Sequence, residues 1–229
     1  MRRFLFSMLL TAGVVALAGC MAYDEGKDGM DFVIGSGYTP PVDRLAAYVP
    51  KRILLLPLTG HLDDRYKHEF LNTFRSVLND QAPWTVIDWP GSTLGDSRLE
   101  VLRADALEMA NRLQCDTMLF IQLEDASIYP PLRQCVRYTL EQTATGQVIA
   151  SAFQDFDSST KPVANSARSF YQTNLNRQIS PDKSLIILNS NPLFTKYVAT
   201  ESANSLKMAL QPPPTSTAST ETVSPLPRR

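Results

Sequence analysis

The pattern of apolar and polar positions between residues 51 and 210 predicts one α/β domain. Short continuous apolar runs predict buried strands, and apolar residues that recur at helical spacing predict amphipathic helices. The expected strands are 51–58, 84–88, 117–123, 135–142 and 147–156. The expected helices are 62–79, 97–113, 163–178 and 191–210, with a brief apolar segment at 184–188. This order predicts a mixed sheet, in which parallel strands are joined by helices and followed by antiparallel hairpin strands, with the helices packed on the sheet.

Residues 143–146, Thr-Ala-Thr-Gly, predict the turn of a β-hairpin, because a glycine at this position accepts a positive φ. Pairing about this turn places Val136, Tyr138 and Leu140 beside Phe153, Ser151 and Ile149. One face of the hairpin is then apolar, and the other carries Arg137, Thr139 and Gln154. The hairpin and the exposed edges of the sheet are the surfaces expected to dock other proteins or a second copy of the chain.

Residues 1–19 have the layout of a secretory signal peptide, with two arginines, an apolar run and small residues at its end. The apolar run has about 14 residues, fewer than the roughly 20 that a transmembrane helix needs. Leu17, Ala18 and Gly19 are followed by Cys20, and this stretch resembles the lipobox of bacterial lipoproteins. The resemblance implies that the signal peptidase recognises these three residues and that Cys20 carries acyl chains such as palmitate. The alternative is a plain leader followed by an unmodified cysteine.

The segments on either side of the domain predict a tether and a tail. Residues 20–50 are rich in glycine and proline and are expected to form a flexible, lipidated spacer. Residues 211–229 are dominated by proline, serine and threonine, which predicts a disordered tail. The second mature residue is Met21 rather than Asp, which by the sorting rule of bacterial lipoproteins implies the periplasmic face of the outer membrane.

The net charge and the cysteine content of the chain bear on nucleic-acid binding and on disulfide formation. A formal net charge of −1 gives no electrostatic reason for binding nucleic acid. Once Cys20 is acylated, Cys115 and Cys135 are the remaining candidates for a disulfide. A hairpin turn centred near residue 128 would place Cys135 opposite residue 121 or 122, roughly 20 Å from Cys115, whereas a disulfide needs Cα atoms within about 7 Å. Two buried thiols are therefore expected, with a disulfide as the alternative.

Candidate chemistry concentrates around the two histidines of the chain. His61, Asp64 and His68 are spaced by three and four residues, so one side of a helix can present two imidazoles and a carboxylate to a metal. A helical wheel places them opposite the apolar stripe, however, and acidic residues are common in a first helical turn. The 125–131 loop offers Tyr129 followed by two prolines, either as a partner contact or as a rigid turn. We expect no catalytic residue, no metal site and no cofactor.

The run Arg52–Pro57, the alanine-rich helix that leads to Asp116, and the hairpin residues Thr145 and Gly146 resemble a superfamily of bacterial envelope proteins. It includes the curli secretion lipoprotein, the activators of penicillin-binding proteins, the Pel polysaccharide export lipoprotein and the amino-terminal domain of TolB. The resemblance implies a non-catalytic outer-membrane lipoprotein that acts as a scaffold, assembly or regulatory factor in secretion, polysaccharide export or cell-wall synthesis. Its expected partners are the membrane, through the lipid, and envelope proteins or further copies of the chain. The alternative is an envelope hydrolase or metal-binding protein that uses His61 and His68.

Overall fold

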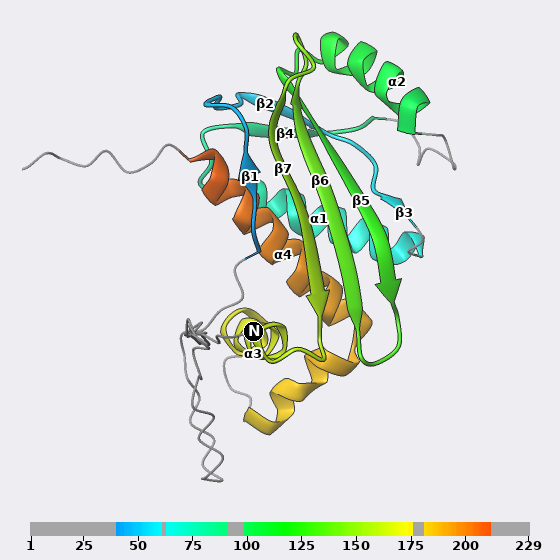
Figure 1. Ribbon diagram of the computed structural model, residues 1–229, viewed down its shortest axis with the longest axis vertical. Helices are drawn as coiled ribbons and strands as arrows, with labels where there is room; N and C mark the ends of the chain where they lie inside the picture. Colours follow the sequence, from blue (N-terminus) through cyan, green and yellow to red (C-terminus); the bar gives the residue numbers. More distant parts are fainter. Residues whose placement is uncertain (1–39, 61–62, 91–98, 176–180, 212–229) are drawn as a thin grey trace, which may run out of the picture. The chain divides into compact units, whose positions relative to one another are not determined.

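The computed structural model describes residues 40–60, 63–90, 99–175 and 181–211. In this part of the chain, a seven-stranded mixed sheet has the order β1-β7-β6-β5-β2-β4, with β3 beside β5, and helices pack against it (Figure 1). The predicted fold class, an α/β fold with parallel strands joined by helices and antiparallel hairpin strands, is confirmed.

The parallel part of the sheet consists of β2 (Arg52–Leu55), β4 (Thr85–Asp88) and the first half of β5 (Thr117–Ser127). Helix α1 (Asp64–Asn79) connects β2 with β4, and α2 (Leu99–Arg112) connects β4 with β5. The expected strand 51–58 is interrupted at Pro57, which has no N–H to donate to a ladder. Beyond it, the two residues of β3 (Thr59–Gly60) resume parallel pairing with β5.

The antiparallel part consists of β5, β6 (Arg133–Gln142) and β7 (Val148–Asp157). The predicted hairpin register is correct next to the turn, where Glu141 pairs with Val148. A bulge between Leu140 and Glu141 then shifts the pairing of the remaining residues of β6 and β7 by one position. A shift of one residue moves every following side chain to the other face of a strand. The expected sides of Phe153 and Gln154 were therefore wrong: Gln154 is buried under the helices, and Phe153 is 46% exposed on the opposite face.

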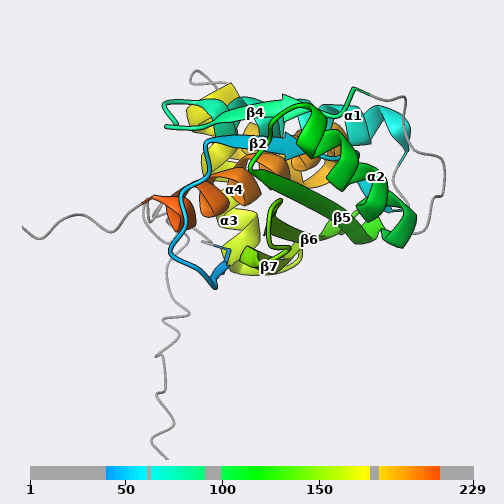
Figure 2. The same ribbon diagram turned by 90° about the horizontal axis from the view of Figure 1, so that it is seen from above.

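The larger core lies on the face of the sheet that α1, α3 (Lys161–Phe170) and α4 (Asn191–Leu210) cover, and Figures 1 and 2 show α1 and α4 side by side there. Aromatic rings join the layers. Phe74 of α1 meets Tyr138 of β6 edge to face, with ring centroids 6.4 Å apart. Tyr197 of α4 contacts the rings of Phe156, Phe170 and Phe194 at 5.7–5.8 Å. Burial of such rings is the main term that holds the helices on the sheet.

The start of α4 differs from its prediction by one residue. Asn191 was expected to be the N-cap, but Ser190 occupies that position and Asn191 is the first helical residue. The reason lies in the core, where the buried Gln134 amide donates to Asn191 Oδ1 at 3.2 Å and to Thr195 Oγ1 at 2.7 Å. A buried amide needs hydrogen-bond partners, and this side chain takes them from α4.

Helix α2 packs on the opposite face of the sheet and forms a second, smaller core with β2 and β5. Ala106 and Ala110 are fully buried against Leu54 and Met118. The small alanine side chains let the helix lie close to the strands. The predicted capping serine of this helix, Ser97, lies outside the described residues.

Residues 40–50, expected at the end of the spacer, lie against the domain. Strand β1 (Asp43–Arg44) pairs antiparallel with β7. The Asp116 carboxylate then accepts hydrogen bonds from the Tyr48 hydroxyl at 2.7 Å and from the backbone N–H groups of Lys51 and Arg52 at 2.9 and 2.8 Å. Strand β1 and Tyr48 therefore contact the domain, although they precede residue 51, where the domain was expected to begin.

The region between β7 and α4 contains three helical segments where one longer helix and a short apolar segment were expected. Helix α3 continues as one π-helical turn, η1 (Tyr171–Leu175), and a 3₁₀ helix, η2 (Pro181–Asn189), contains the apolar stretch 184–188. Ile187 is fully buried, whereas Leu185 and Ile186 are exposed.

Candidate protein-docking face

The outer face of the sheet, which we define as the side of β5, β6 and β7 turned away from α1, α3 and α4, carries a row of polar and charged side chains. From β6 it includes Arg133, Cys135, Arg137, Thr139 and Glu141, in the alternation of a strand buried on one side. Helix α2 covers one corner of this face, over Phe120. Elsewhere on the face Arg137 and Phe153 are exposed, whereas Cys135 is buried.

Arg133 forms a bidentate ion pair on the outer face. Its Nε and Nη2 atoms donate to the two Asp155 oxygens at 3.0 and 2.6 Å, and Asp125 lies 3.4 Å from its Nη1 atom. Donation by Arg133 lowers the pKa of the Asp155 carboxyl. A bidentate arginine–carboxylate pair fixes both side chains in the plane of the guanidinium, so this cluster is ordered before any partner arrives.

Arg137 connects all three strands. It donates to Glu124 of β5, and this hydrogen bond raises the pKa of the arginine. Its guanidinium carbon lies 4.9 Å from the centroid of the Phe153 ring of β7. The exposed ring therefore has a cation above it, a geometry that supports cation–π attraction.

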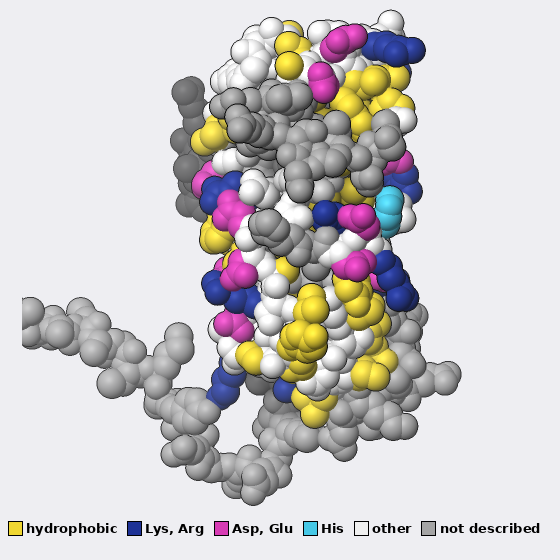
Figure 3. Space-filling model, turned by 90° about the vertical axis from the view of Figure 1, so that its right-hand side faces the viewer, with side chains coloured by type: hydrophobic (Ala, Val, Ile, Leu, Met, Phe, Trp, Pro, Cys, Tyr) yellow, Lys and Arg dark blue, Asp and Glu magenta, His cyan; other side chains and the backbone are white. Residues whose placement is uncertain are grey.

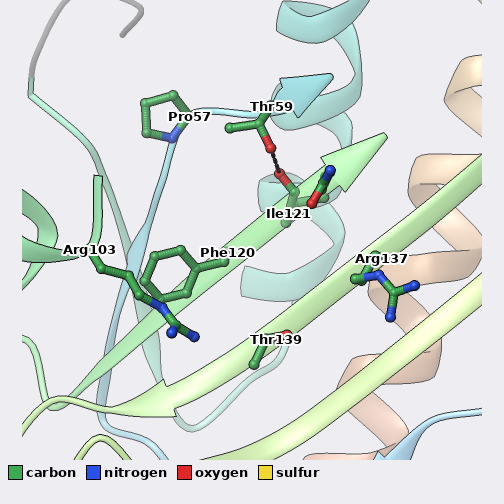
Figure 4. Close-up of a pocket in the computed structure, with 8 residues that line it drawn as sticks. Pro57, Thr59, Arg103, Phe120, Ile121, Arg137 and Thr139 are labelled. Carbon is green, nitrogen blue, oxygen red and sulfur yellow. Dashed lines mark hydrogen bonds between the residues drawn. The ribbon is translucent and has the colours of Figure 1, made fainter. Parts of the chain in front are cut away.

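Arg103 brings α2 to the same face. It forms an ion pair with Glu141 of β6, and its guanidinium carbon lies 5.5 Å from the Phe120 ring centroid. Figure 4 shows Arg103 and Arg137 approaching from two sides of Phe120 and Thr139. Between them lies a shallow hollow of about 60 Å³, to which Thr59 and Gln122 also contribute. Small-molecule sites typically measure about 300–1,000 Å³, so the hollow is better suited to a single inserted side chain.

Both cysteines of the described chain are free and buried, as expected. The expected register was incorrect in detail, because Cys135 pairs with Asp125 rather than with residue 121 or 122, which places it further along the sheet from Cys115. Burial and the neighbouring Asp155 carboxylate raise the pKa of Cys135 to about 11, and burial also raises that of Cys115. Neither thiol has the character of a nucleophile at neutral pH.

Among the described residues, no group of three or more histidine, cysteine or acidic side chains is placed to hold a metal ion. His68 is exposed on α1, and His61 lies outside the described residues. Asp63 is the N-cap of α1, where its carboxylate accepts from the Arg65 N–H at 2.9 Å, and Asp64 pairs with Lys67 at 3.4 Å. Both aspartates thus serve the start of the helix.

The β5–β6 loop displays two large apolar side chains. Tyr129 is 75% exposed and Ile128 is 48% exposed. The Ser127 hydroxyl donates to the Tyr129 carbonyl at 2.8 Å, and the Leu132 carbonyl accepts from the Ser158 N–H at 2.9 Å. In Figure 3, hydrophobic side chains are visible toward the lower end of the molecule and again at its upper end, with a band of mixed charge between them.

The predicted lipidation site, Cys20, and the recognition residues Leu17, Ala18 and Gly19 lie outside the described residues. Within the described part of the chain, no helix is both long enough and apolar enough to cross a bilayer.

The fold defines a layered α/β domain with a mixed sheet, and its candidate site is a charged sheet face with a shallow hollow. No protein-family model and no curated protein matches the sequence. Similar solved structures include the PelC dodecamer from Paraburkholderia phytofirmans, with 14% identity and a TM-score of 0.41 over 67% of this chain and 98% of that one. They also include lipoprotein GNA1162 from Neisseria meningitidis, with 14% identity and a TM-score of 0.39 over 49% and 87%. The LpoB C-terminal domain from Salmonella enterica has 16% identity and a TM-score of 0.34 over 48% and 84%. Because these TM-scores lie below 0.5, no function is transferred from them, and the superfamily resemblance remains an expectation from the sequence.

Sequence reasoning missed most of the outer face. It placed Arg137 and Thr139 on the polar side of the hairpin, but it did not identify the partners Arg103, Glu124 and Asp155. Pairing Arg137 with Glu124 requires the β5–β6 register, and Arg103 comes from a helix that is distant in sequence. The polar residues Arg137 and Thr139, two positions apart on the predicted strand, were the signal that marked this strand face in advance.

Proposed function

We propose that this chain is a non-catalytic lipoprotein of the outer membrane, acylated at Cys20, whose periplasmic domain docks other envelope components. The observation that carries the proposal is the stretch Leu17, Ala18, Gly19 and Cys20 at the end of an apolar leader. Two or more acyl chains give effectively stable attachment to a bilayer, since each buried CH₂ contributes about 0.8 kcal/mol. Met21 at the second mature position favours the outer membrane.

The outer face supports the docking part of the proposal. Its three arginines are each held by a carboxylate, and Phe153 is exposed among them. Arginine and aromatic side chains are enriched at protein interfaces, where prior ordering lowers the entropic cost of binding. Envelope machinery for secretion, polysaccharide export or cell-wall synthesis, or a second copy of this chain, is the kind of partner proposed.

Metabolic labelling with a radioactive fatty acid tests the anchor. The wild-type chain should incorporate label, and the Cys20→Ser variant should not. Membrane fractionation of the labelled protein then assigns the inner or outer membrane. Label that persists in the serine variant would rule out acylation of Cys20.

Charge reversal tests the docking face. Arg133→Glu and Arg137→Glu should each remove the envelope proteins that cross-link to the wild-type chain in cells. Arg75→Glu is the matched control, because Arg75 of α1 also pairs with a carboxylate, Asp88, but lies outside the outer face. If all three variants lose the cross-linked proteins equally, or if Arg133→Glu and Arg137→Glu lose none of them, docking through this face is contradicted.

The hydrolase or metal-binding alternative rests on the two histidines. If His61→Ala combined with His68→Ala abolishes function while leaving stability and acylation intact, the non-catalytic proposal fails.

A further inference from the structure

The exposed tip of the β5–β6 loop lies at the end of the sheet where the amino-terminal segment joins the domain. Strand β7 runs toward this end, because its last residue, Asp157, pairs with Arg133, which in turn pairs with Ser127 at the end of β5. Strand β1 is antiparallel to β7, and the Pro41 carbonyl accepts from Gln154 Nε2 at 3.4 Å. Pro41 is therefore about three residues, or roughly 10 Å, along the sheet from the start of the loop.

The loop tip has an apolar, uncharged composition. Residues 128–132 are Ile-Tyr-Pro-Pro-Leu. Leu132 is fully buried and fixes the base of the loop, whereas Ile128 and Tyr129 face solvent. Figure 1 shows η2, in golden yellow, at the same lower end of the molecule, and η2 exposes Leu185 and Ile186.

The opposite end of the sheet has a different character. There the β6–β7 hairpin turns through Thr143, Ala144, Thr145 and Gly146, and these residues include no large apolar side chain. The tip of the β5–β6 loop thus carries two large exposed apolar side chains, whereas the turn of the β6–β7 hairpin carries none. Away from the two turns, Leu45 and Leu107 are also exposed.

We propose that Ile128 and Tyr129 form a second contact with the membrane and insert into the lipid headgroup region of the bilayer that holds the acylated chain. This inference rests on the proposed anchoring at Cys20. A segment of about 20 residues, the length of 20–39, cannot span more than roughly 70 Å even when fully extended. The domain is therefore confined near the bilayer, and a contact too weak to bind from solution is populated by effective concentration.

The chemistry of the tip fits a lipid interface better than a protein pocket. Tyrosine is enriched at membrane–water boundaries, where its ring lies among acyl chains and its hydroxyl stays hydrated. The tip carries no charge that would have to be desolvated. If the loop tip contacts the lipid, the outer face of the sheet stays accessible to protein partners.

Tryptophan reporters test the contact in the full-length acylated protein, reconstituted into vesicles of phosphatidylethanolamine and phosphatidylglycerol. Tyr129→Trp reports on the tip, and Phe153→Trp, at a position 46% exposed on the outer face, is the matched control. Because interfacial side chains lie about 5–10 Å into the headgroup and acyl boundary, acyl chains brominated along their length should quench roughly half of the emission added by Tyr129→Trp. The emission added by Phe153→Trp should not change.

A second tether separates this inference from the proposed anchor. The chain from residue 21 onward, with an amino-terminal hexahistidine tag, is bound to vesicles through a nickel-chelating lipid. Failure of the full-length protein to float with vesicles would refute acylation, whereas the nickel-tethered chain still reports whether the tip enters the lipid.

Three results would overturn the inference. The first is a Tyr129→Trp signal that bromine does not quench and that aqueous iodide quenches as well with vesicles as without them. The second is protection of the Tyr129→Trp emission from iodide that rises with protein concentration in the absence of vesicles, which would assign the tip to a contact with a second copy of the chain. The third is protection from iodide that requires added envelope proteins, which would assign the tip to a contact with a protein partner.

Discussion

Replacement of Glu201 by glutamine is expected to stabilise the domain at neutral pH and above. Glu201 lies in α4, one helical turn from the buried residues Tyr197 and Ser205. No hydrogen bond to its carboxylate is found among the described residues, and burial raises its pKa from 4.5 to about 7. Glutamine has nearly the same shape and is neutral at every pH, so the variant removes the cost of a buried charge with little change in packing.

The expected gain follows from the shift in pKa. Between pH 4.5 and about 7 the folded state holds a proton that the unfolded state has lost, so the free energy of unfolding falls by about 1.4 kcal/mol per pH unit. This contribution is complete below pH 4.5 and is lost by about pH 7. The full shift corresponds to at most about 3 kcal/mol, because the carboxylate is only partly buried. For a domain of this size, that is roughly 6–12 °C in Tm.

Urea unfolding followed by tryptophan fluorescence measures this difference, with the buried Trp84 as reporter. The free energy of unfolding of Glu201→Gln should equal that of the wild type at pH 4.5 and exceed it by up to about 3 kcal/mol at pH 8. Glu108→Gln, at an exposed position of α2, is the matched control and should change little at either pH. A gain that is equal at both pH values, or absent at pH 8, would refute desolvation of Glu201 as the cause.

Further predictions concern the backbone and the Asp116 cluster. Gly60→Ala should lower the free energy of unfolding by roughly 3 kcal/mol or more, because φ is +118° and a Cβ would lie 2.0 Å from the Leu123 carbonyl oxygen. Gly146→Ala, at φ +67° with no atom within 4 Å of the new Cβ, should lose only about 1–2 kcal/mol in the same urea titration. The Asp116→Asn variant should have a free energy of unfolding lower by about 2 kcal/mol, since one amide oxygen replaces a carboxylate that accepts three hydrogen bonds. Trypsin should also cleave residues 44–52 faster in this variant. An unchanged cleavage rate would contradict the role of Asp116 in holding that segment. Burial, together with the hydrogen bond to Asp116, raises the pKa of Tyr48 from 10 to about 12. The stability that Tyr48 contributes below pH 10 should therefore be lost as the pH rises toward 12, and the Tyr48→Phe variant should lose less stability over that interval.

Local signals predicted most of the fold because each element buries one regular face. The stripe that includes Phe70 and Phe74 marks α1, and the apolar run that begins at residue 51 marks β2, although it was expected to continue to residue 58. The turn glycine, Gly146, adopts the positive φ that its position predicts. These features depend on residues close in sequence, where periodicity and turn chemistry are direct evidence of structure.

Errors arose where a distant contact decides the outcome. The bulge at Leu140 and Glu141 leaves no clear signal in composition, yet it exchanges the faces of Phe153 and Gln154. Ser190 replaces Asn191 as the N-cap because Gln134, on a strand far away in sequence, binds the asparagine side chain. The candidate site depends on such contacts more than the fold does, which is why its ion pairs could not be predicted.

The positions of residues 40–46 and of Asn79 change which surfaces remain available for docking. The sequence favoured the exposed sheet edges, but residues 43–46 hydrogen-bond to β7, and Pro41, which has no N–H, lies beside Gln154. At the other edge, Asn79 Oδ1 accepts from the Val86 N–H of β4 at 2.9 Å. A proline and a side-chain cap are both devices that prevent a further strand from pairing with an edge. With parts of both edges occupied in this way, a partner is more readily bound through side chains, and the ordered arginines and exposed Phe153 of the outer face provide that contact.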